Sequence, residues 1–183
     1  MNAPDVEAAF QAAPSERVAE ILDGDLHTFP RPRLRHARAA SRLGGALDPF
    51  DRDVGGPGGW VILDEPELHL GPRPDKIVPD LAGWRRARMP ELPDDAAVRL
   101  APDWVCEVLS EHTEAVDRGA KLRIYRREKV GHAWLVSPAL RTLEVYRLQA
   151  GSWVLVETFE GDARIRAEPF DAIELELGTL WAR

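Results

Sequence analysis

Cysteine is almost absent from this sequence, since Cys106 is the only one among 183 residues. A disulfide framework and a cysteine-based zinc site both need several cysteines, so both are excluded. Long hydrophobic runs are missing too, because no stretch approaches the ~18 uncharged apolar residues of a membrane span. Residues 1–17 contain acids and no apolar core, unlike a signal peptide. We therefore expect a cytoplasmic protein with no membrane segment.

Positive charge is in the minority. The chain has 24 Lys and Arg against 31 Asp and Glu, a net charge of −7, whereas a protein that binds DNA mainly through phosphates is usually basic. The arginines are nevertheless clustered in three segments, at residues 31–42 (RPRLRHARAASR), 84–88 (WRRAR) and 121–129 (KLRIYRREK). The net charge therefore does not decide between solvated faces and an anion-binding surface.

The length and the balance of residue types suit one globular domain. Apolar residues account for 44% of the chain and charged residues for 30%, both close to globular averages. Residues 1–14 are small and acidic and include two prolines, which predicts a flexible tail. Residues 15–183 are then expected to form a single domain.

The first part of the chain alternates between turn residues and short apolar runs. Residues 18–29 predict a β-hairpin around Asp23-Gly24, a dipeptide that favours two-residue turns. Apolar residues at helical spacing predict a helix over 36–47, ended by Gly44-Gly45 or by Asp48-Pro49. Residues 59–70 are expected to form one strand, or two with a break at Pro66, and a further strand is expected over 76–84.

The pattern is clearest from residue 104 onward. Residues 104–110 (WVCEVLS) form a nearly continuous apolar run, typical of a strand buried on both faces, which is interrupted by Glu107. A helix is predicted from Thr113 to about Glu128, followed by a buried strand over 132–138. This order predicts a parallel crossover and hence a mixed α/β domain. Strands over 142–148 and 152–159 are expected to form a second hairpin around Gln149-Ala150-Gly151, and residues 170–177 a short terminal strand or extended edge.

Glu107 is the most informative residue of the chain, because a carboxylate in a buried strand requires a compensating interaction. Left unpaired, it would cost several kcal/mol or take up a proton, so it requires an ion pair, a cleft or a metal ion. Asp80 has a similar setting after the short run Ile77-Val78-Pro79. Two acids on neighbouring strands can hold a hard divalent ion such as Mg²⁺, which prefers oxygen ligands and keeps several waters.

The helix after Glu107 supplies a cation. Asp117, Lys121 and Tyr125 follow one another at intervals of four residues, so they share one helix face. An ordinary surface ion pair between Asp117 and Lys121 is one interpretation. If the helix packs back over the acidic end of the sheet, however, the ammonium can position a nucleophilic water and offset charge on a phosphate.

Residues 102–138, PDWVCEVLSEHTEAVDRGAKLRIYRREKVGHAWLVSP, resemble the core of the Uma2 (DUF820) family, which is grouped with the PD-(D/E)XK nuclease superfamily. The resemblance extends back through residues 77–84 (IVPDLAGW) to residues 19–43, so it covers most of 18–138. It implies a restriction-endonuclease-like α/β fold, a mixed β-sheet flanked by helices. An extra N-terminal hairpin and C-terminal strands complete the expected architecture.

The resemblance also implies roles for particular residues. Asp80 matches the metal-binding aspartate of the superfamily, and Glu107 matches the acid of its (D/E)XK element. The standard lysine would follow two residues later, where this chain has Leu109. The resemblance implies that the role of this lysine has moved into the next helix, where Lys121 fits.

Four further residues are weaker candidates. Glu20 matches another acidic position of the family that approaches the site, with an ordinary surface acid as the alternative. His36 aligns with a family histidine at the start of the first helix, where a capping or core role is equally compatible. Arg85 and Arg86 follow Trp84 in an Arg- and Pro-rich loop and are candidates for contact with nucleic acid, which Trp84 could also face. We expect the basic segments 31–42 and 84–88 to flank the mouth of the acidic site.

Together these features lead us to expect a Mg²⁺-dependent endonuclease that hydrolyses phosphodiester bonds in DNA, with Mn²⁺ as a substitute for Mg²⁺. Asp80 and Glu107 would bind the metal with the carbonyl of Val108, and Lys121 would orient the attacking water. The acidic net charge and Leu109 keep open a catalytically inactive nuclease-fold protein that binds nucleic acid or a protein partner. A glycosidase-type hydrolase is a poorer alternative, because the lysine would have no role. We expect DNA as the partner, with a homodimer left open.

Overall fold

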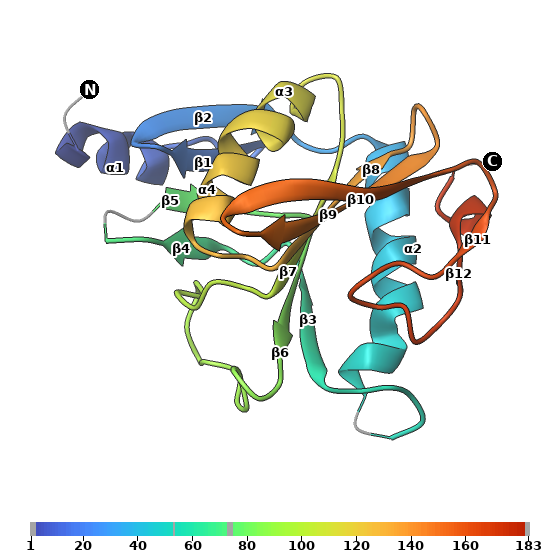
Figure 1. Cartoon of the computed structure of the whole chain (residues 1–183). Coiled ribbons are helices and arrows are strands. Elements are labelled where there is room, and N and C mark those ends of the chain that lie inside the picture. Colours follow the sequence, from blue (N-terminus) through green and yellow to red (C-terminus); the bar gives the residue numbers. More distant parts are fainter. Residues whose placement is uncertain (1–2, 53, 73–74, 182–183) are drawn as a thin grey trace.

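The computed structural model describes residues 3–52, 54–72 and 75–181 and is built around a six-stranded mixed sheet (Figure 1). Its strands follow the order β10-β9-β8-β7-β6-β3. They are β3 (Trp60–Asp64), β6 (Leu81–Arg85), β7 (Trp104–Val108), β8 (His132–Ser137), β9 (Thr142–Gln149) and β10 (Ser152–Glu160). Only the β7–β8 pair is parallel within this sheet, which is what the predicted crossover requires.

Two smaller antiparallel sheets accompany the large one. The four-stranded sheet has the order β2-β1-β5-β4 and contains β1 (Arg17–Leu22), β2 (Asp25–Pro30), β4 (Leu68–Leu70) and β5 (Asp75–Ile77). Near the C-terminus, β11 (Arg164–Ile165) pairs with β12 (Leu175–Glu176) and is followed by a short 3-10 helix, η2 (Leu177–Thr179). Figure 1 shows β11 and β12 alongside the long helix α2 (Leu34–Asp51).

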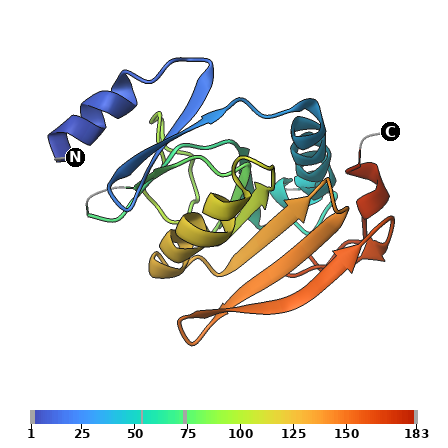
Figure 2. The same ribbon diagram turned by 90° about the horizontal axis from the view of Figure 1, so that it is seen from above.

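Helices cover both faces of the six-stranded sheet (Figure 2). On one face, α2 and the C-terminal segment pack against side chains such as Trp104 and Cys106. On the other, the crossover helix and the four-stranded sheet pack against Val105 and Ala82. Since side chains alternate along β7, Glu107 points to the same face as Val105, toward the crossover helix.

The crossover helix lies within the predicted residues, but it is not a regular α-helix. It begins as α3 (Glu114–Val116), continues as a π-helical turn, η1 (Asp117–Lys121), and ends as α4 (Leu122–Arg127). Single π-helical turns inside α-helices occur frequently at functional sites. Here the turn contains the two charged side chains that are buried against the sheet, Asp117 and Lys121.

Both predicted hairpins are confirmed. Asp23 and Gly24 connect β1 and β2 with φ values of 52° and 88°, and Ala150 and Gly151 connect β9 and β10 with 49° and 77°. Two consecutive residues with positive φ form the type I′ turn that matches the twist of paired strands.

The predicted end of the first long helix is wrong. Instead of ending at Gly44-Gly45 or Asp48-Pro49, α2 continues to Asp51, with Pro49 inside it. Leu47 and Phe50 are buried and extend the apolar stripe of the helix into the core, so tertiary packing outweighs the local signals. Gly44 lies where an added Cβ would come within 3.0 Å of Asp64 Oδ1, so its small size permits close packing on β3.

Other boundaries also differ from expectation. The strand predicted over 76–84 is divided between β5 and β6, which belong to different sheets, and Asp80 lies between them. Residues 59–70 do form two strands, β3 and β4, which confirms the predicted alternative with a break at Pro66. The strand predicted over 170–177 is reduced to β12. Proline lacks a backbone N–H, so Pro66 and Pro79 favour these breaks.

The prediction of a flexible tail over residues 1–14 is wrong for residues 3–11, which form helix α1 (Ala3–Gln11). Val6 is buried, and Glu7 Oε1 accepts a 2.5 Å hydrogen bond from Lys76 Nζ on β5. Residues 1–2 lie outside the described part. Within the described residues, no helix combines the length and apolarity needed to cross a membrane.

Candidate active site

Asp80 and Glu107 meet at the edge where β6 begins and β7 ends. Leu81 pairs with Cys106, so Asp80 lies beside the last residues of β7. Its Oδ2 atom accepts a 2.6 Å hydrogen bond from the backbone N–H of Val108. Both carboxylates line one pocket with a volume of about 770 Å³.

Lys121 lies in the middle of a cluster of carboxylates. Its Nζ atom is 3.0 Å from Glu20 Oε1, 3.1 Å from Glu107 Oε2 and 3.3 Å from Asp117 Oδ1. All four side chains line the pocket, and each residue is at most 5% exposed. The helix therefore does pack back over the acidic end of the sheet, so the interpretation of Asp117 and Lys121 as a surface ion pair is wrong.

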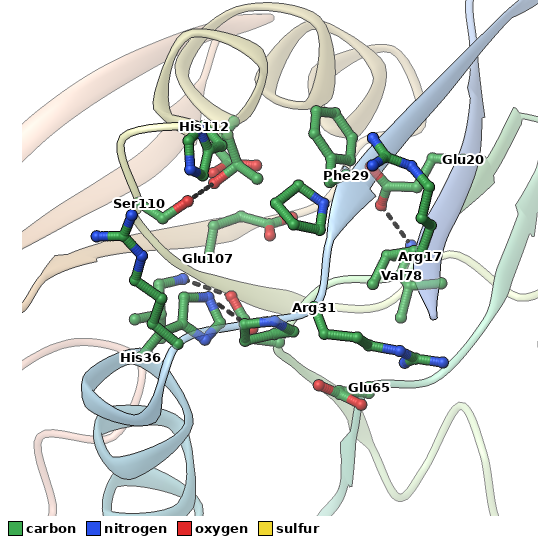
Figure 3. A pocket seen from close by; sticks show the side chains of 18 of the residues that line it. Arg17, Glu20, Phe29, Arg31, His36, Glu65, Val78, Glu107, Ser110 and His112 are labelled. Atoms are coloured by element: carbon green, nitrogen blue, oxygen red, sulfur yellow. Dashed lines mark hydrogen bonds and ion pairs between the residues drawn. The ribbon is translucent and has the colours of Figure 1, made fainter. Parts of the chain in front are cut away.

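Glu107 and Glu20 are each held by a second contact. The Tyr125 hydroxyl donates a 2.5 Å hydrogen bond to Glu107 Oε1, and the backbone N–H of Val78 donates a 2.8 Å hydrogen bond to Glu20 Oε1. Figure 3 shows Glu107 from β7, Glu20 from β1 and His36 from α2 around the same pocket. Three elements that are distant in the sequence thus position the charged groups.

His36 connects α2 to the acids. Its Nε2 atom is 3.2 Å from Asp80 Oδ1, and both side chains are nearly buried. Burial by itself lowers the pKa of His36, but the hydrogen bond to Asp80 and the charges of Asp80 and Asp117 outweigh it and raise the pKa above its ordinary value. His36 is therefore part of the charged cluster and is not a helix cap.

The cluster contains more acids than bases, and this excess dominates its electrostatics. Burial raises the pKa of Glu107 well above its usual range, against the opposing effect of Lys121, and the other acids add to the rise. Burial also raises the pKa of Asp117. Burial alone would lower the pKa of Lys121, yet Glu107, Glu20 and Asp117 together hold it well above its usual value. Lys121 is therefore a permanent cation, and the cluster has capacity for further positive charge.

These residues fit a magnesium ion bound by few protein ligands. Among the described residues, no group of three His, Cys, Asp or Glu side chains has the arrangement of a metal site. Mg²⁺ is commonly bound through only one or two carboxylates, with water completing its shell. Asp80 and Glu107 supply oxygen donors of that kind. In addition, Glu20 Oε2 is buried without a hydrogen-bond partner among the described residues, which marks unsatisfied negative charge.

Arg85 and Arg86 lie away from this pocket. They are at the far end of β6 from Asp80, and neither lines the cavity. The Arg85 guanidinium stacks 4.0 Å from the centroid of the Trp60 ring, and Arg86 Nη2 donates a 2.9 Å hydrogen bond to the Trp60 carbonyl. The prediction that residues 84–88 flank the site is therefore wrong, as is an exposed role for Trp84, which is fully buried.

A different set of arginines surrounds the mouth of the pocket. These come from β1, from the segment that leads into α2 and from the first turn of α2, and they are Arg17, Arg31, Arg33 and Arg35. Figure 3 shows Arg17 and Arg31 at its edge. The basic segment 31–42 thus reaches the acidic site, as expected.

Leu109 stands where the family resemblance predicts the standard lysine. It is 5% exposed and packs with Leu122 and Tyr125 in the core beneath the crossover helix. In the sequence, Asp117 and Tyr125 are identifiable only as neighbours of Lys121 on one helix face. Their spacing of four residues was the available signal, while their contacts with the acidic site required the fold.

Two results of a comparison with known proteins bear on the fold and the family. A family model described as "Uma2: Putative restriction endonuclease" matches residues 6–178. Among solved structures, the crystal structure of a "putative nuclease belonging to DUF820" from Anabaena variabilis ATCC 29413 superposes with a TM-score of 0.73 and 22% sequence identity, over 94% of each chain. This likeness confirms the predicted fold. No curated protein matches the chain.

Proposed function

Because the chain belongs to the Uma2 family, we propose that it is a Mg²⁺-dependent endonuclease that hydrolyses phosphodiester bonds in DNA. The observation that carries this proposal is the buried Lys121 ammonium among Glu20, Glu107 and Asp117, in an open pocket that Asp80 also lines. Buried charges are expensive to maintain, and perturbed titratable groups gathered in a cavity favour a functional site over a structural one.

Asp80 and Glu107 are the residues that would hold the metal. When bound there, Mg²⁺ would supply Lewis-acid polarisation of the scissile phosphate and a more acidic water. The backbone N–H of Val108 and the His36 side chain fix the Asp80 carboxylate, while Tyr125 fixes that of Glu107. The protein thereby orients both carboxylates before any ligand enters.

Lys121 acts as a cation and hydrogen-bond donor. Because its pKa lies well above its usual value, the ammonium keeps its proton at neutral pH and cannot serve as a general base. It can donate to the attacking water or to a phosphate oxygen and offset the negative charge that builds up during the displacement. Glu20 and Asp117 hold this ammonium in place, so they are positioning residues.

A cleavage assay tests the proposal. The wild-type protein should nick or cut plasmid DNA in the presence of Mg²⁺ or Mn²⁺, and EDTA should prevent the reaction. Lys121→Met should be inactive, whereas Lys76→Met should retain activity. Lys76 is a matched control because it is also a buried lysine in an ion pair, with Glu7, but does not line the pocket.

Single-stranded DNA and RNA, offered as separate substrates, define the polymer that is cleaved. If the protein cleaves none of the three substrates in a metal-dependent reaction, the proposal is overturned. Binding of DNA without cleavage would instead favour an inactive nuclease-fold protein that binds nucleic acid.

A further inference from the structure

A second groove adjoins the candidate active site and has a different chemical character. It has a volume of about 1170 Å³ and lies where α2 meets residues of the C-terminal segment. Arg35, Pro138 and Ala139 line both this groove and the acidic pocket, so the two cavities share a wall. Figure 1 shows β11 and β12 beside α2, where they form the opposite wall.

Among the described residues, five arginines and two acids line the groove. On the C-terminal wall, Arg141 is paired with Asp162, and Arg164 Nη2 is 2.8 Å from Glu176 Oε1. These pairs neutralise the acids of that wall. The arginines of α2 therefore give the groove its positive charge; they are Arg35, Arg38 and Arg42.

The three α2 arginines have no partners in the part of the chain that the structure describes. All three are exposed, and none makes a hydrogen bond or ion pair with another described residue. By contrast, most arginines elsewhere in the described chain are paired, for example Arg118 with Glu144 and Arg127 with Asp75. Like charges three and four residues apart destabilise a helix, so this row is costly unless an anion occupies the groove.

The spacing of the row suits a nucleic-acid backbone. Residues 35, 38 and 42 fall on one side of an α-helix, next to its buried face. Seven residues rise ~10.5 Å along the helix. Successive phosphates of one DNA strand are spaced ~3.4 Å along the duplex axis, so a row aligned with that axis extends over about three nucleotides. Guanidinium groups suit phosphate oxygens because they donate in a planar fork.

We propose that this groove binds the phosphate backbone of the DNA substrate next to the scissile bond, with Arg38 and Arg42 as its principal contacts. The inference rests on the proposed nuclease function and extends it, since it assigns a path to the strand as it leaves the acidic pocket. An acidic protein would by its net charge repel a polyanionic substrate. Local arginines supply the attraction that the net charge of −7 does not.

The test compares two double variants with the same change of charge. R38Q/R42Q removes the groove contacts, while R99Q/R126Q removes two other exposed arginines that are unpaired among the described residues and line neither cavity. Binding of a short fluorescein-labelled DNA duplex is measured by anisotropy in EDTA between about 50 and 200 mM salt. Each lost phosphate contact lowers the slope of log K against log salt concentration by ~0.9. We expect R38Q/R42Q to flatten that slope by about 1.8, with R99Q/R126Q unchanged.

Cleavage kinetics separate this inference from the proposed function. In R38Q/R42Q the kcat at saturating DNA should match that of the wild type and the KM should rise, because no residue of the acidic pocket is altered. R38K/R42K should restore most of the salt slope. If the wild-type protein cleaves DNA but the two glutamine variants have equal slopes of log K against log salt concentration, the proposed role of the groove is refuted. The proposed nuclease function then stands. A wild-type protein that neither binds nor cleaves DNA would overturn the proposed function itself.

Discussion

Replacing Lys121 by methionine should reduce stability as well as activity. Methionine keeps much of the apolar stem but removes a cation that lies 3.0–3.3 Å from three buried carboxylates. Breaking a buried ion pair by removing one partner typically costs about 3–5 kcal/mol, because the remaining charge is left uncompensated. We expect a loss of this size in the free energy of unfolding near pH 8 with EDTA present.

The loss should become smaller as the pH falls. Burial already raises the pKa of Glu107 and Asp117 in the folded protein, and removal of the ammonium raises both further. A carboxyl group whose folded-state pKa exceeds its unfolded value contributes stability that is fully present below the unfolded pKa, about 4. That contribution is lost as the pH rises through the folded pKa. The deficit of Lys121→Met should therefore be small near pH ~4 and largest at neutral to alkaline pH.

Urea denaturation across this pH range measures the effect. The fluorescence of the buried tryptophans, Trp60 and Trp134 among them, reports unfolding. Lys76→Met is the control, since its partner Glu7 is half exposed and can be rehydrated. If Lys121→Met loses the same unfolding free energy at low and high pH, the loss comes from altered packing and not from the carboxylates. No loss near pH 8 would refute the view that the carboxylates depend on Lys121.

Three further predictions concern neighbouring residues of the cluster. Glu107→Gln should abolish metal-dependent cleavage and weaken Mn²⁺ binding measured by calorimetry, because a charged ligand is lost; unchanged Mn²⁺ affinity would contradict its role as a ligand. Tyr125→Phe removes a hydrogen bond to a buried carboxylate, which is worth about 1.5–3 kcal/mol. We expect kcat to fall while KM changes little. An unchanged kcat would argue against a positioning role for Tyr125. For His36, the hydrogen bond and charge of Asp80 raise the pKa despite burial. The stabilisation by this pair is therefore fully present below the unfolded pKa of ~6.5 and lost as the pH rises through the folded pKa. The difference in unfolding free energy between wild type and His36→Gln should narrow over that range, and a constant difference would mean that His36 stays neutral throughout.

The sequence by itself determined the features that depend on near neighbours. Asp23-Gly24 specifies a tight hairpin because both residues tolerate positive φ. The apolar run around Glu107 and the helix after it specify a buried strand with a parallel crossover, since the connection has the required length. The same run identified Glu107 as a buried carboxylate that needs a partner.

Only the tertiary structure decided which distant groups surround that carboxylate. Glu20, His36 and Lys121 come from three elements whose convergence depends on how two sheets and two helices pack. The family resemblance named these residues as candidates, but no local sequence pattern brings them together. Packing also carried α2 past Gly44-Gly45, because burial of Leu47 and Phe50 outweighs weak helix-breaking signals. Finally, the fold separated two basic segments of similar composition. Residues 31–42 lie beside the acidic pocket, whereas residues 84–88 lie at the opposite end of β6. Each residue of a strand advances the chain by ~3.3 Å, so the length of β6 separates residues 84–88 from Asp80.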